Sequence, residues 1–481
     1  MVRKLLRLRK LKRVYNRITD TFVYNISFET YTKPTRRSIV VAEAFGLGVD
    51  EATVFPVLDV ELLIRKRDIV YITGDSGSGK SVLLRALRKD LGEEAADLDD
   101  VYVDVEKPLI ETIGSTVEEG LELLSKVGMN DAFLFLRSYS QLSDGQKYRY
   151  KVAKLIESGK RWWLADEFCA SLDRDTAKIV AFNLQKLARQ QGRAVIAATT
   201  HQDLLEDLAP DVLVRKRFGK EIDVKYIPGA GVSECSLVRE MRVEEGSIED
   251  WRKLCVFHYR GHRTSPRKKI FKLTRGEELC GVIVYTWPPP ACYGRRMKLP
   301  KLTMREFNSC LSTINRVVIH PKYRTIGLGV KLIRETLPLA GTRYVELIAV
   351  MAKYSPFAVN AGMQEVAVQE PSKDILRIAE KLTALGFDVQ LLGSRQYVMQ
   401  KLQGLRAEDV DSLKEVFCKN SHPRLKKEVT RSGEGRNLPW GCLEDYKRSV
   451  QEANLERVAG FIRIAGMLLQ KKVYLFWDRG S

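Results

Sequence analysis

Residues 69–81 are Ile-Val-Tyr-Ile-Thr-Gly-Asp-Ser-Gly-Ser-Gly-Lys-Ser, an apolar run followed by a glycine-rich loop. The run 69–72 predicts a buried strand, and residues 74–81 match the pattern GxxxxGKS. Glycines let backbone N–H groups wrap phosphates, and the helix expected from Lys80 directs the positive end of its dipole at them. We therefore expect a phosphate site here, with Lys80 on the β/γ-phosphates and the Ser81 hydroxyl on Mg²⁺.

Further motifs follow in the same half of the chain. They are Leu-Ser-Asp-Gly-Gln at 142–146, Trp-Trp-Leu-Ala-Asp-Glu at 162–167, Ser-Leu-Asp at 171–173, and a histidine at 201 after the strand-like run 194–198. Asp166 closes an apolar run, so we expect it at the end of a buried strand, facing the metal. Glu167 is the candidate general base that polarises the attacking water, and His201 is a candidate contact of the γ-phosphate.

In this order, the motifs resemble the nucleotide-binding domain of the ABC ATPase superfamily over about residues 40–228. The resemblance implies an α/β P-loop fold, ATP with Mg²⁺, and a homodimer that closes over two ATP molecules. In that family the signature, here Ser143 and Gly145, contacts ATP held by the opposite protomer. The residues implied for ATP are Gly74, Asp75, Ser76, Gly77, Ser78, Gly79, Lys80, Ser81, Ser143, Gly145, Gln146, Asp166 and Asp173, with Ser81 and Asp166 on the metal and Glu167 and His201 catalytic.

Two positions depart from the family pattern. No glutamine lies between Ser81 and Gln141, so the usual Q-loop residue is missing, and Glu106 occupies about its place. The second glycine of the signature is replaced by Asp144. Neither change removes the expected ATP site, but the first leaves open how hydrolysis is coupled to the helical subdomain.

The composition indicates a chain of two or three domains that binds polyanions. The 481 residues are 44% hydrophobic, enough for two or three cores. The sequence has no uninterrupted apolar run of about 20 residues, so no membrane span is predicted. Eight cysteines without a CxxC pair predict reduced thiols and a cytoplasmic location. The formal net charge of +19 favours a nucleic-acid partner, DNA or RNA.

The basic residues are clustered. Residues 1–17 carry eight of them and no acid, and 260–275 carry seven and no acid; a third cluster spans 419–436. The first segment is interpreted as part of a basic arm, 1–38, that binds nucleic acid. A membrane-surface helix, a transit peptide and a solvated helix packed on the ATPase remain alternatives.

The pattern changes beyond residue 230. Strands are expected at 281–286, 314–320 and 344–351, with a helix at 330–337 after the loop Arg324-Thr-Ile-Gly327-Leu-Gly329. This succession resembles the GNAT acyltransferase superfamily over about residues 236–402. The resemblance implies an α+β domain in which Arg324, Gly327 and Gly329 bind the pyrophosphate of an acyl-CoA such as acetyl-CoA.

The acyltransferase chemistry rests on fewer residues. Tyr354 is the candidate acid, since a tyrosine in that segment often has this role in the resembled family. No carboxylate lies on the strand 314–320, so Glu346 on the next strand is a possible base, and Tyr354 packed in a core is the alternative. The element His258-Tyr-Arg, with His262, faintly resembles the Mom-like branch, which modifies adenine in phage DNA; a surface histidine beside a solvated loop is the alternative.

The whole chain resembles a family of ABC-type ATPases fused to a GNAT-like domain, found in archaea and phages. We expect a basic arm at 1–38, the ATPase at 39–230, the GNAT-like domain at 236–402 and a mainly helical extension at 403–481. The leading hypothesis is an ATP-driven enzyme that modifies a base or a nucleic-acid-bound amine. The alternatives are an ATP-driven switch with a non-catalytic GNAT-like module and, less favoured, the ATPase subunit of a transporter.

Overall fold

The structure is a computed structural model of the chain, and it describes residues 6–30, 34–47, 54–129, 132–227, 229, 231–258, 265–350, 356–426 and 443–480. Two compact units are present. The larger comprises Met1–Thr286 with Asn315–Leu339, and the smaller comprises Trp287–Ile314 with Ala340–Ser481.

The larger unit contains a six-stranded sheet in the order β5-β6-β7-β4-β8-β9. Its strands are β4 (Ile69–Thr73), β5 (Ala95–Asp97), β6 (Trp162–Ala165), β7 (Ala194–Ala198), β8 (Val212–Lys216) and β9 (Ile222–Tyr226). The first five in this order pair in parallel, and β9 is antiparallel to β8. The residues that follow β4, β6 and β7 therefore meet at one edge of the sheet, where ligands bind in such folds.

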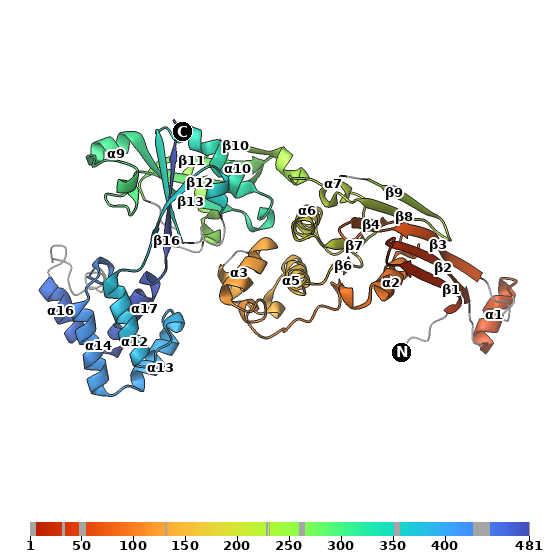
Figure 1. Cartoon of the computed structure of the whole chain (residues 1–481), viewed down its shortest axis with the longest axis horizontal. Coiled ribbons are helices and arrows are strands. Elements are labelled where there is room, and N and C mark those ends of the chain that lie inside the picture. Colours follow the sequence, from red (N-terminus) through yellow and green to blue (C-terminus); the bar gives the residue numbers. More distant parts are fainter. Residues whose placement is uncertain are drawn as a thin grey trace. The chain divides into compact units, whose positions relative to one another are not determined.

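Both faces of this sheet are covered, which explains why β4, β6 and β7 are buried along their whole length and, apart from Thr73, are apolar. Successive residues of a strand point to opposite faces, so Tyr71 lies in one hydrophobic core and Ile72 in another. One core is closed by α2 (Lys80–Leu91) and a three-stranded antiparallel sheet, visible beside α2 in Figure 1. The other is closed mainly by α3 (Val117–Lys126), α5 (Asp144–Glu157), α6 (Arg174–Gln191) and α7 (Leu205–Leu208).

The three-stranded sheet corrects the interpretation of the N-terminal segment. It consists of β1 (Leu6–Asn16), β2 (Thr21–Thr30) and β3 (Val54–Leu63), in that order. The basic residues 6–16 are thus an edge strand rather than a free arm or a helix. Tyr15 stacks on Phe22 and Arg13 pairs with Asp90 of α2, so one face of the hairpin packs on the domain. The short helix α1 (Arg36–Ala44) follows β2, and α4 (Ala132–Phe135) lies between α3 and α5.

The rest of the larger unit is a mixed α/β layer. Its strands are β10 (Met241–Glu245), β11 (Arg267–Arg275), β12 (Glu278–Thr286) and the last residues of β13 (Leu311–Ile319), in this order. Trp251 and Leu254 of α8 (Ile248–Leu254) pack on Val282 and Val284 of β12. After β13 the chain enters α10 (Leu328–Thr336) through Gly327, where φ is 87°.

The smaller unit combines the first residues of β13 with β14 (Tyr344–Ala349), β16 (Lys472–Asp478) and β15 (Gln364–Gln369), in this order. Between β15 and β16 the chain makes a helical cluster, shown in blue in Figure 1. The helices of this unit include α9 (Met304–Cys310), α11 (Phe357–Asn360), α12 (Lys373–Ala384), α13 (Arg395–Gln403), α14 (Ala407–Lys419), α16 (Leu443–Gln451) and α17 (Leu455–Leu468).

The compact units do not follow the domain boundaries expected from the sequence. Residues beyond 230 share the larger unit with the first sheet, and β16 enters the sheet between β14 and β15, so residues 403–481 are not a separate extension. Within these residues α16 and α17 are separate helices, because Asn454 caps a new helix at Leu455.

Candidate ATP-binding site

The loop from Gly74 to Ser81 leaves the carboxyl end of β4 and enters α2 through glycines with positive φ. The φ angle is 145° at Gly74, 78° at Gly77 and 104° at Gly79. A Cβ at Gly74 would lie 1.9 Å from the Lys216 carbonyl oxygen, and one at Gly79 would lie 2.6 Å from Val57 Cγ1. Only glycine therefore fits at Gly74 and Gly79 without a shift of the neighbouring chain.

Lys80 begins α2 and lies inside this loop. Its Nζ atom donates to the carbonyl oxygens of Gly74 and Asp75, each at 2.7 Å. Burial lowers the pKa of Lys80, and the negative charges of Asp166, Asp75 and Glu167 act in the opposite direction. The ammonium group is thus within electrostatic reach of the two carboxylates that follow β6.

Unsatisfied polar groups of the loop fit a bound phosphate chain. Ser78 Oγ is buried and, within the described part of the chain, has no hydrogen-bond partner. Such a hydroxyl costs about 1–3 kcal/mol unless a ligand or water satisfies it. The N-cap of α2 is Gly79, which supplies no side-chain cap, so the first N–H groups of the helix can receive an anion. The residues present therefore fit a nucleoside triphosphate.

Asp166, Glu167 and His201 follow the neighbouring strands β6 and β7. Asp166 is partly buried, and its Oδ1 accepts from the Glu167 backbone N–H at 3.0 Å. Glu167 is exposed and has a φ of 46°, a strained conformation for this residue type. The His201 carbonyl accepts from Tyr71 OH at 2.6 Å, which holds the histidine segment against β4.

Ser143 and Asp144 of the signature are exposed at the start of α5, whereas Gly145 and Gln146 are half-buried and Leu142 is buried. Ser143 is the N-cap: its Oγ accepts from the Gln146 backbone N–H, and its own backbone N–H donates to Gln146 Oε1. Asp173 caps α6 in the same way through the Thr176 N–H at 3.1 Å. Burial acts to raise the pKa of Asp173, but its hydrogen bonds to Thr176 outweigh this effect and leave that pKa lowered.

Known proteins resemble part of the chain. No family model matches it. The methionine import ATP-binding protein MetN of Mesorhizobium japonicum is 27% identical over 201 aligned positions, and the match covers 33% of this chain and 53% of that protein. MetN of Streptococcus pneumoniae is 29% identical over 205 aligned positions, and that match covers 34% of this chain and 57% of that protein. The chain thus spans about half the length of these curated relatives.

Among solved structures, an ATP-binding cassette in a dimeric post-hydrolysis state with ADP and Pi aligns with 37% of this chain and 93% of its own. That alignment has 20% identity and a TM-score of 0.32. The cbiO1 protein of Clostridium perfringens, part of an ABC transporter complex, aligns with 36% of this chain and 82% of its own, at 18% identity and a TM-score of 0.30. Scores of this size add no argument about function.

Five motifs in order, a matching loop geometry and the similarity to MetN proteins agree on one point. The N-terminal part of the chain forms an ABC-type ATP-binding domain. The roles of its individual residues remain predictions.

The ATP-binding domain has two further residues beside its glycine-rich loop. Lys216, at the end of β8, is 1% exposed and donates to the carbonyl oxygens of Arg217 and Gly219 at 2.5 and 2.6 Å. Phe218 is 63% exposed, and its ring approaches Gly77. Only the long-range pairing of β8 with β4 brings these residues to the loop, so no local pattern indicates them.

Glu106, the residue near the Q-loop position, lies exposed within the ATP-binding domain. Its backbone N–H donates to Asp104 Oδ1 at 3.0 Å. Nothing in this geometry assigns it the role of the missing glutamine.

The second expected site is only partly described. Arg324 Nε donates to the Ile319 carbonyl at 3.2 Å, and Gly327 is the exposed N-cap of α10, with Gly329 in the first turn. Tyr354 and His262 lie outside the described residues.

The structure contradicts the alternative of Glu346 as a base. This carboxylate is fully buried and accepts from Arg295 Nε and Nη2 at 3.0 and 2.6 Å, from Thr313 Oγ1 at 2.8 Å and from Tyr474 OH at 3.1 Å. Because its two carboxylate oxygens already accept four hydrogen bonds and are buried, Glu346 cannot approach a substrate amine to accept its proton.

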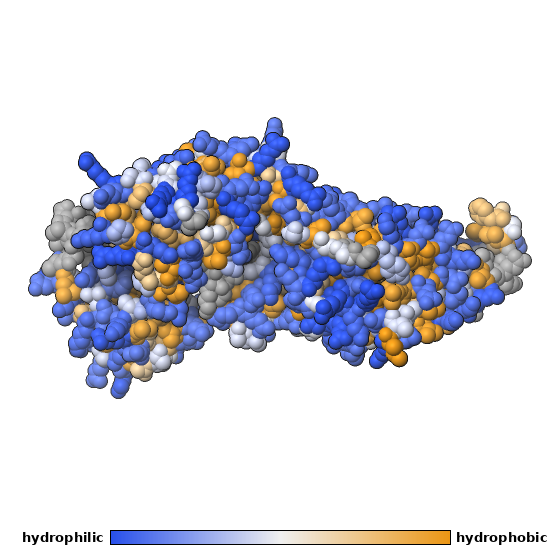
Figure 2. Space-filling view, turned by 45° about the horizontal axis from the view of Figure 1, so that its top comes forward, coloured by the Kyte–Doolittle hydropathy of each residue, from blue (hydrophilic) through white to orange (hydrophobic). Residues whose placement is uncertain are grey.

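Within the described ranges, no group of three or more His, Cys, Asp and Glu side chains could hold a metal ion, and the seven described cysteines are free thiols. None of the described helices is both long and apolar enough to span a membrane. Polar residues cover most of the face shown in Figure 2.

Replacing Gly79 with Ala is expected to abolish tight ATP binding, lowering affinity by at least about tenfold, because the new Cβ meets Val57 and displaces the loop. Gly92→Ala is the matched control. It lies at the other end of α2, also has positive φ (55°), but meets no atom within 4 Å. Equilibrium binding of a fluorescent ATP analogue measures both. Equal affinities for the two variants would contradict the close packing described for Gly79.

Proposed function

We propose that the chain hydrolyses ATP in a composite site formed by two copies of its ATP-binding domain. The arrangement of Lys80 and the unsatisfied Ser78 hydroxyl inside the loop, with Asp166 and Glu167 within electrostatic reach, carries this proposal. Lys80 would bind the β/γ-phosphates, and Ser81 and Asp166 would hold Mg²⁺, which when bound would neutralise the charge that develops on the phosphates. Glu167 orients and polarises the attacking water.

The second copy completes the site. Ser143, Gly145, Gln146 and Asp173 lie at the N-termini of α5 and α6, where backbone N–H groups favour anions, and the two capping residues are exposed. These residues would face the ATP bound by the opposite copy and supply hydrogen-bond donors that a single copy does not bring to its own ATP. Hydrolysis therefore depends on a homodimer that closes over two ATP molecules, with His201 contacting the γ-phosphate.

Acyl transfer by the GNAT-like residues is a second candidate activity. Parallel strands β13 and β14 pair over Leu311–Thr313 and Tyr344–Glu346, and β13 leads into α10 through the 3-10 turn Pro321–Tyr323. The N-terminus of α10 has Gly327 as its cap and no side-chain cap, which suits the pyrophosphate of an acyl-CoA. Arg324, Gly327 and Gly329 would bind it, and Tyr354 would protonate the leaving thiolate.

Replacing Arg324 with Glu is expected to weaken acetyl-CoA binding by about tenfold or more, since a carboxylate would replace a cation beside the pyrophosphate. Arg334→Glu, the same change at the exposed other end of α10, is the control and should bind as the wild type does. Isothermal titration calorimetry measures both. No binding by the wild type, or equal binding by the two variants, would remove the cofactor proposal and favour a non-catalytic module.

A nucleic acid is the proposed partner. The +19 net charge is partly concentrated on the edge strand β1, where Arg9, Lys10 and Lys12 are exposed and no acidic residue occurs. Counterion release from a phosphate backbone would drive binding to such a strand. The acceptor of the acyl group would then be a base or a nucleic-acid-bound amine.

The names of the relatives, methionine import ATP-binding proteins, support another candidate, the ATPase subunit of an import system. In that role the chain would need membrane subunits from other chains. The mixed sheets and helical cluster that follow the ATP-binding domain argue for a different partner. Co-fractionation of the native protein with membranes would favour the transporter.

The steady-state ATPase rate, measured alone and with duplex DNA, single-stranded DNA or tRNA over a salt series, tests the proposal. We expect Mg²⁺-dependent hydrolysis that Lys80→Ala abolishes, and stimulation by one nucleic acid that fades as salt rises. Hydrolysis with no response to any of them would exclude the nucleic-acid partner. No hydrolysis above the Lys80→Ala background would exclude the ATPase.

A further inference from the structure

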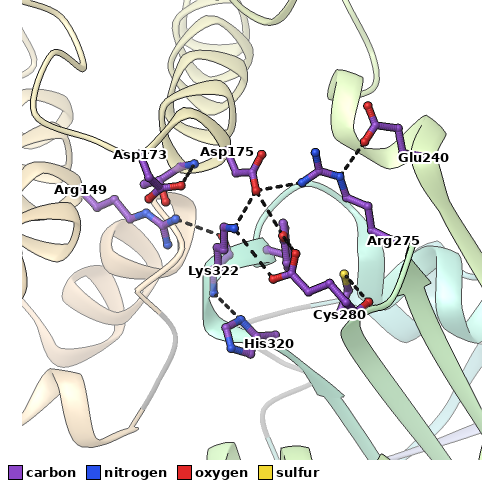
Figure 3. A network of polar contacts seen from close by, with 11 residues as sticks. Arg149, Asp173, Asp175, Glu240, Arg275, Cys280, His320 and Lys322 are labelled. Carbon is purple, nitrogen blue, oxygen red and sulfur yellow. Dashed lines mark hydrogen bonds and ion pairs between the residues drawn. The ribbon is translucent and has the colours of Figure 1, made fainter.

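A cluster of ion pairs joins the first turn of α6 to the segment after β13, within the larger unit (Figure 3). Asp175 Oδ2 accepts from Lys322 Nζ at 2.6 Å and from Arg275 Nη1 at 2.8 Å. Arg275 Nε also pairs with Glu240 at 2.6 Å, and Tyr323 OH donates to Glu278 at 2.6 Å. Asp175 stands two residues after Asp173, the cap of α6.

These ion pairs are largely shielded from solvent, so their loss should affect the structure around them. The side chains of Asp175, Arg275 and Lys322 are only 20%, 24% and 29% exposed. Burial acts to raise the pKa of Asp175, but hydrogen bonds from Lys322 and Arg275 outweigh it and leave that pKa lowered. Removing one partner would therefore leave an incompletely paired charge in a poorly solvated place.

The same segment also contacts α5, the helix that begins at the signature. Arg149 Nη2 of α5 donates to the Lys322 carbonyl at 3.3 Å. Arg149 is 8% exposed, and burial lowers its pKa to about 10. On α6, Asn183 Nδ2 donates to Thr325 Oγ1 at 2.6 Å. Residues 322–325 thus hold α5 and α6 at the same time.

We propose that Lys322 and Arg275 are positioning residues for ATP hydrolysis. The caps of α5 and α6, Ser143 and Asp173, must both reach ATP on the opposite copy, so the spacing of the two helices decides whether the composite site closes. Residues 322–325 lie outside the ATP-binding domain and, by contacting both α5 and α6, fix the distance between the two helices. This inference rests on the proposed ATPase function and makes turnover depend on the second half of the chain.

Lys322→Met removes the charge and keeps the length of the side chain. We expect kcat for ATP to fall by about tenfold with KM changed by less than twofold, since the glycine-rich loop is untouched. Lys322→Arg should restore most of kcat. The matched control is Lys331→Met, which removes a similarly exposed lysine from its pair with Glu335 on α10 and should leave kcat unchanged.

Together with Lys322→Met, the Asp175→Asn variant and the Asp175→Asn/Lys322→Met double variant make a double-mutant cycle, which measures how far the two side chains act together. If the two groups act as one pair, the double variant loses no more activity than the worse single variant. Wild-type kcat in Lys322→Met, or equal losses in Lys322→Met and Lys331→Met, would overturn the inference while leaving the ATPase proposal intact. No hydrolysis by the wild type above the Lys80→Ala background would overturn both.

Discussion

Replacing Glu167 with Gln is expected to lower kcat for ATP by about 100-fold or more while ATP stays bound. A positioned general base contributes about 10²–10⁴-fold to such a reaction, and the amide cannot accept the proton. The exposed Glu167 side chain projects from a strained backbone directly after β6, where Asp166 and Lys80 remain to hold the nucleotide. Because product forms much more slowly, the closed dimer should accumulate with ATP.

Steady-state hydrolysis and size-exclusion chromatography with ATP measure the two effects. Glu206→Gln is the control, since Glu206 is an exposed carboxylate of the same unit that pairs with Arg239. It should hydrolyse ATP at the wild-type rate and form no trapped dimer. Normal turnover by Glu167→Gln would contradict the assignment of the base, whatever the state of the dimer.

Replacing Arg295 with Met is expected to destabilise the smaller unit by about 3–5 kcal/mol, because it leaves the Glu346 carboxylate buried without its main partner. Both side chains are at most 4% exposed, and Arg295 also lies over the Phe307 ring at 4.8 Å. Burial acts to lower the pKa of Arg295, but the pair with Glu346 outweighs it, so the pKa is raised.

Urea unfolding followed by circular dichroism measures the loss. The Arg295→Met/Glu346→Leu double variant should recover part of it, since no unpaired charge remains. Arg343→Met breaks the more exposed Arg343–Asp478 pair of the same unit and should cost at most about 1 kcal/mol. Equal losses of unfolding free energy for Arg295→Met and Arg343→Met would show that the buried pair contributes no more to stability than the exposed pair.

The features that the sequence predicts well are those with local causes. The apolar run before Gly74 forms β4, and the glycines turn the chain into α2, because both depend on neighbouring residues. The strands expected at 281–286 and 314–320 are present in β12 and β13 for the same reason. Motif order was therefore sufficient to predict the ATP-binding domain.

Other features depend on contacts between distant residues. Lys322 and Asp175 are 147 positions apart, and Arg295 and Glu346 are 51 apart, so neither pair is visible in a local pattern. The eight basic residues of the segment 1–17 favour an arm, whereas the alternation of apolar and basic residues within it favours a strand. Its Leu-Arg-Leu-Arg start at residue 6 is a strand pattern, and β2 pairs with it through a short turn.

The dependence of the ATPase rate on protein concentration tests the composite site most directly. If each site needs two copies, the rate per chain should rise in proportion to concentration while dimers are rare, and then reach a plateau. A rate per chain that is the same at every concentration, with the protein monomeric throughout, would contradict the composite site.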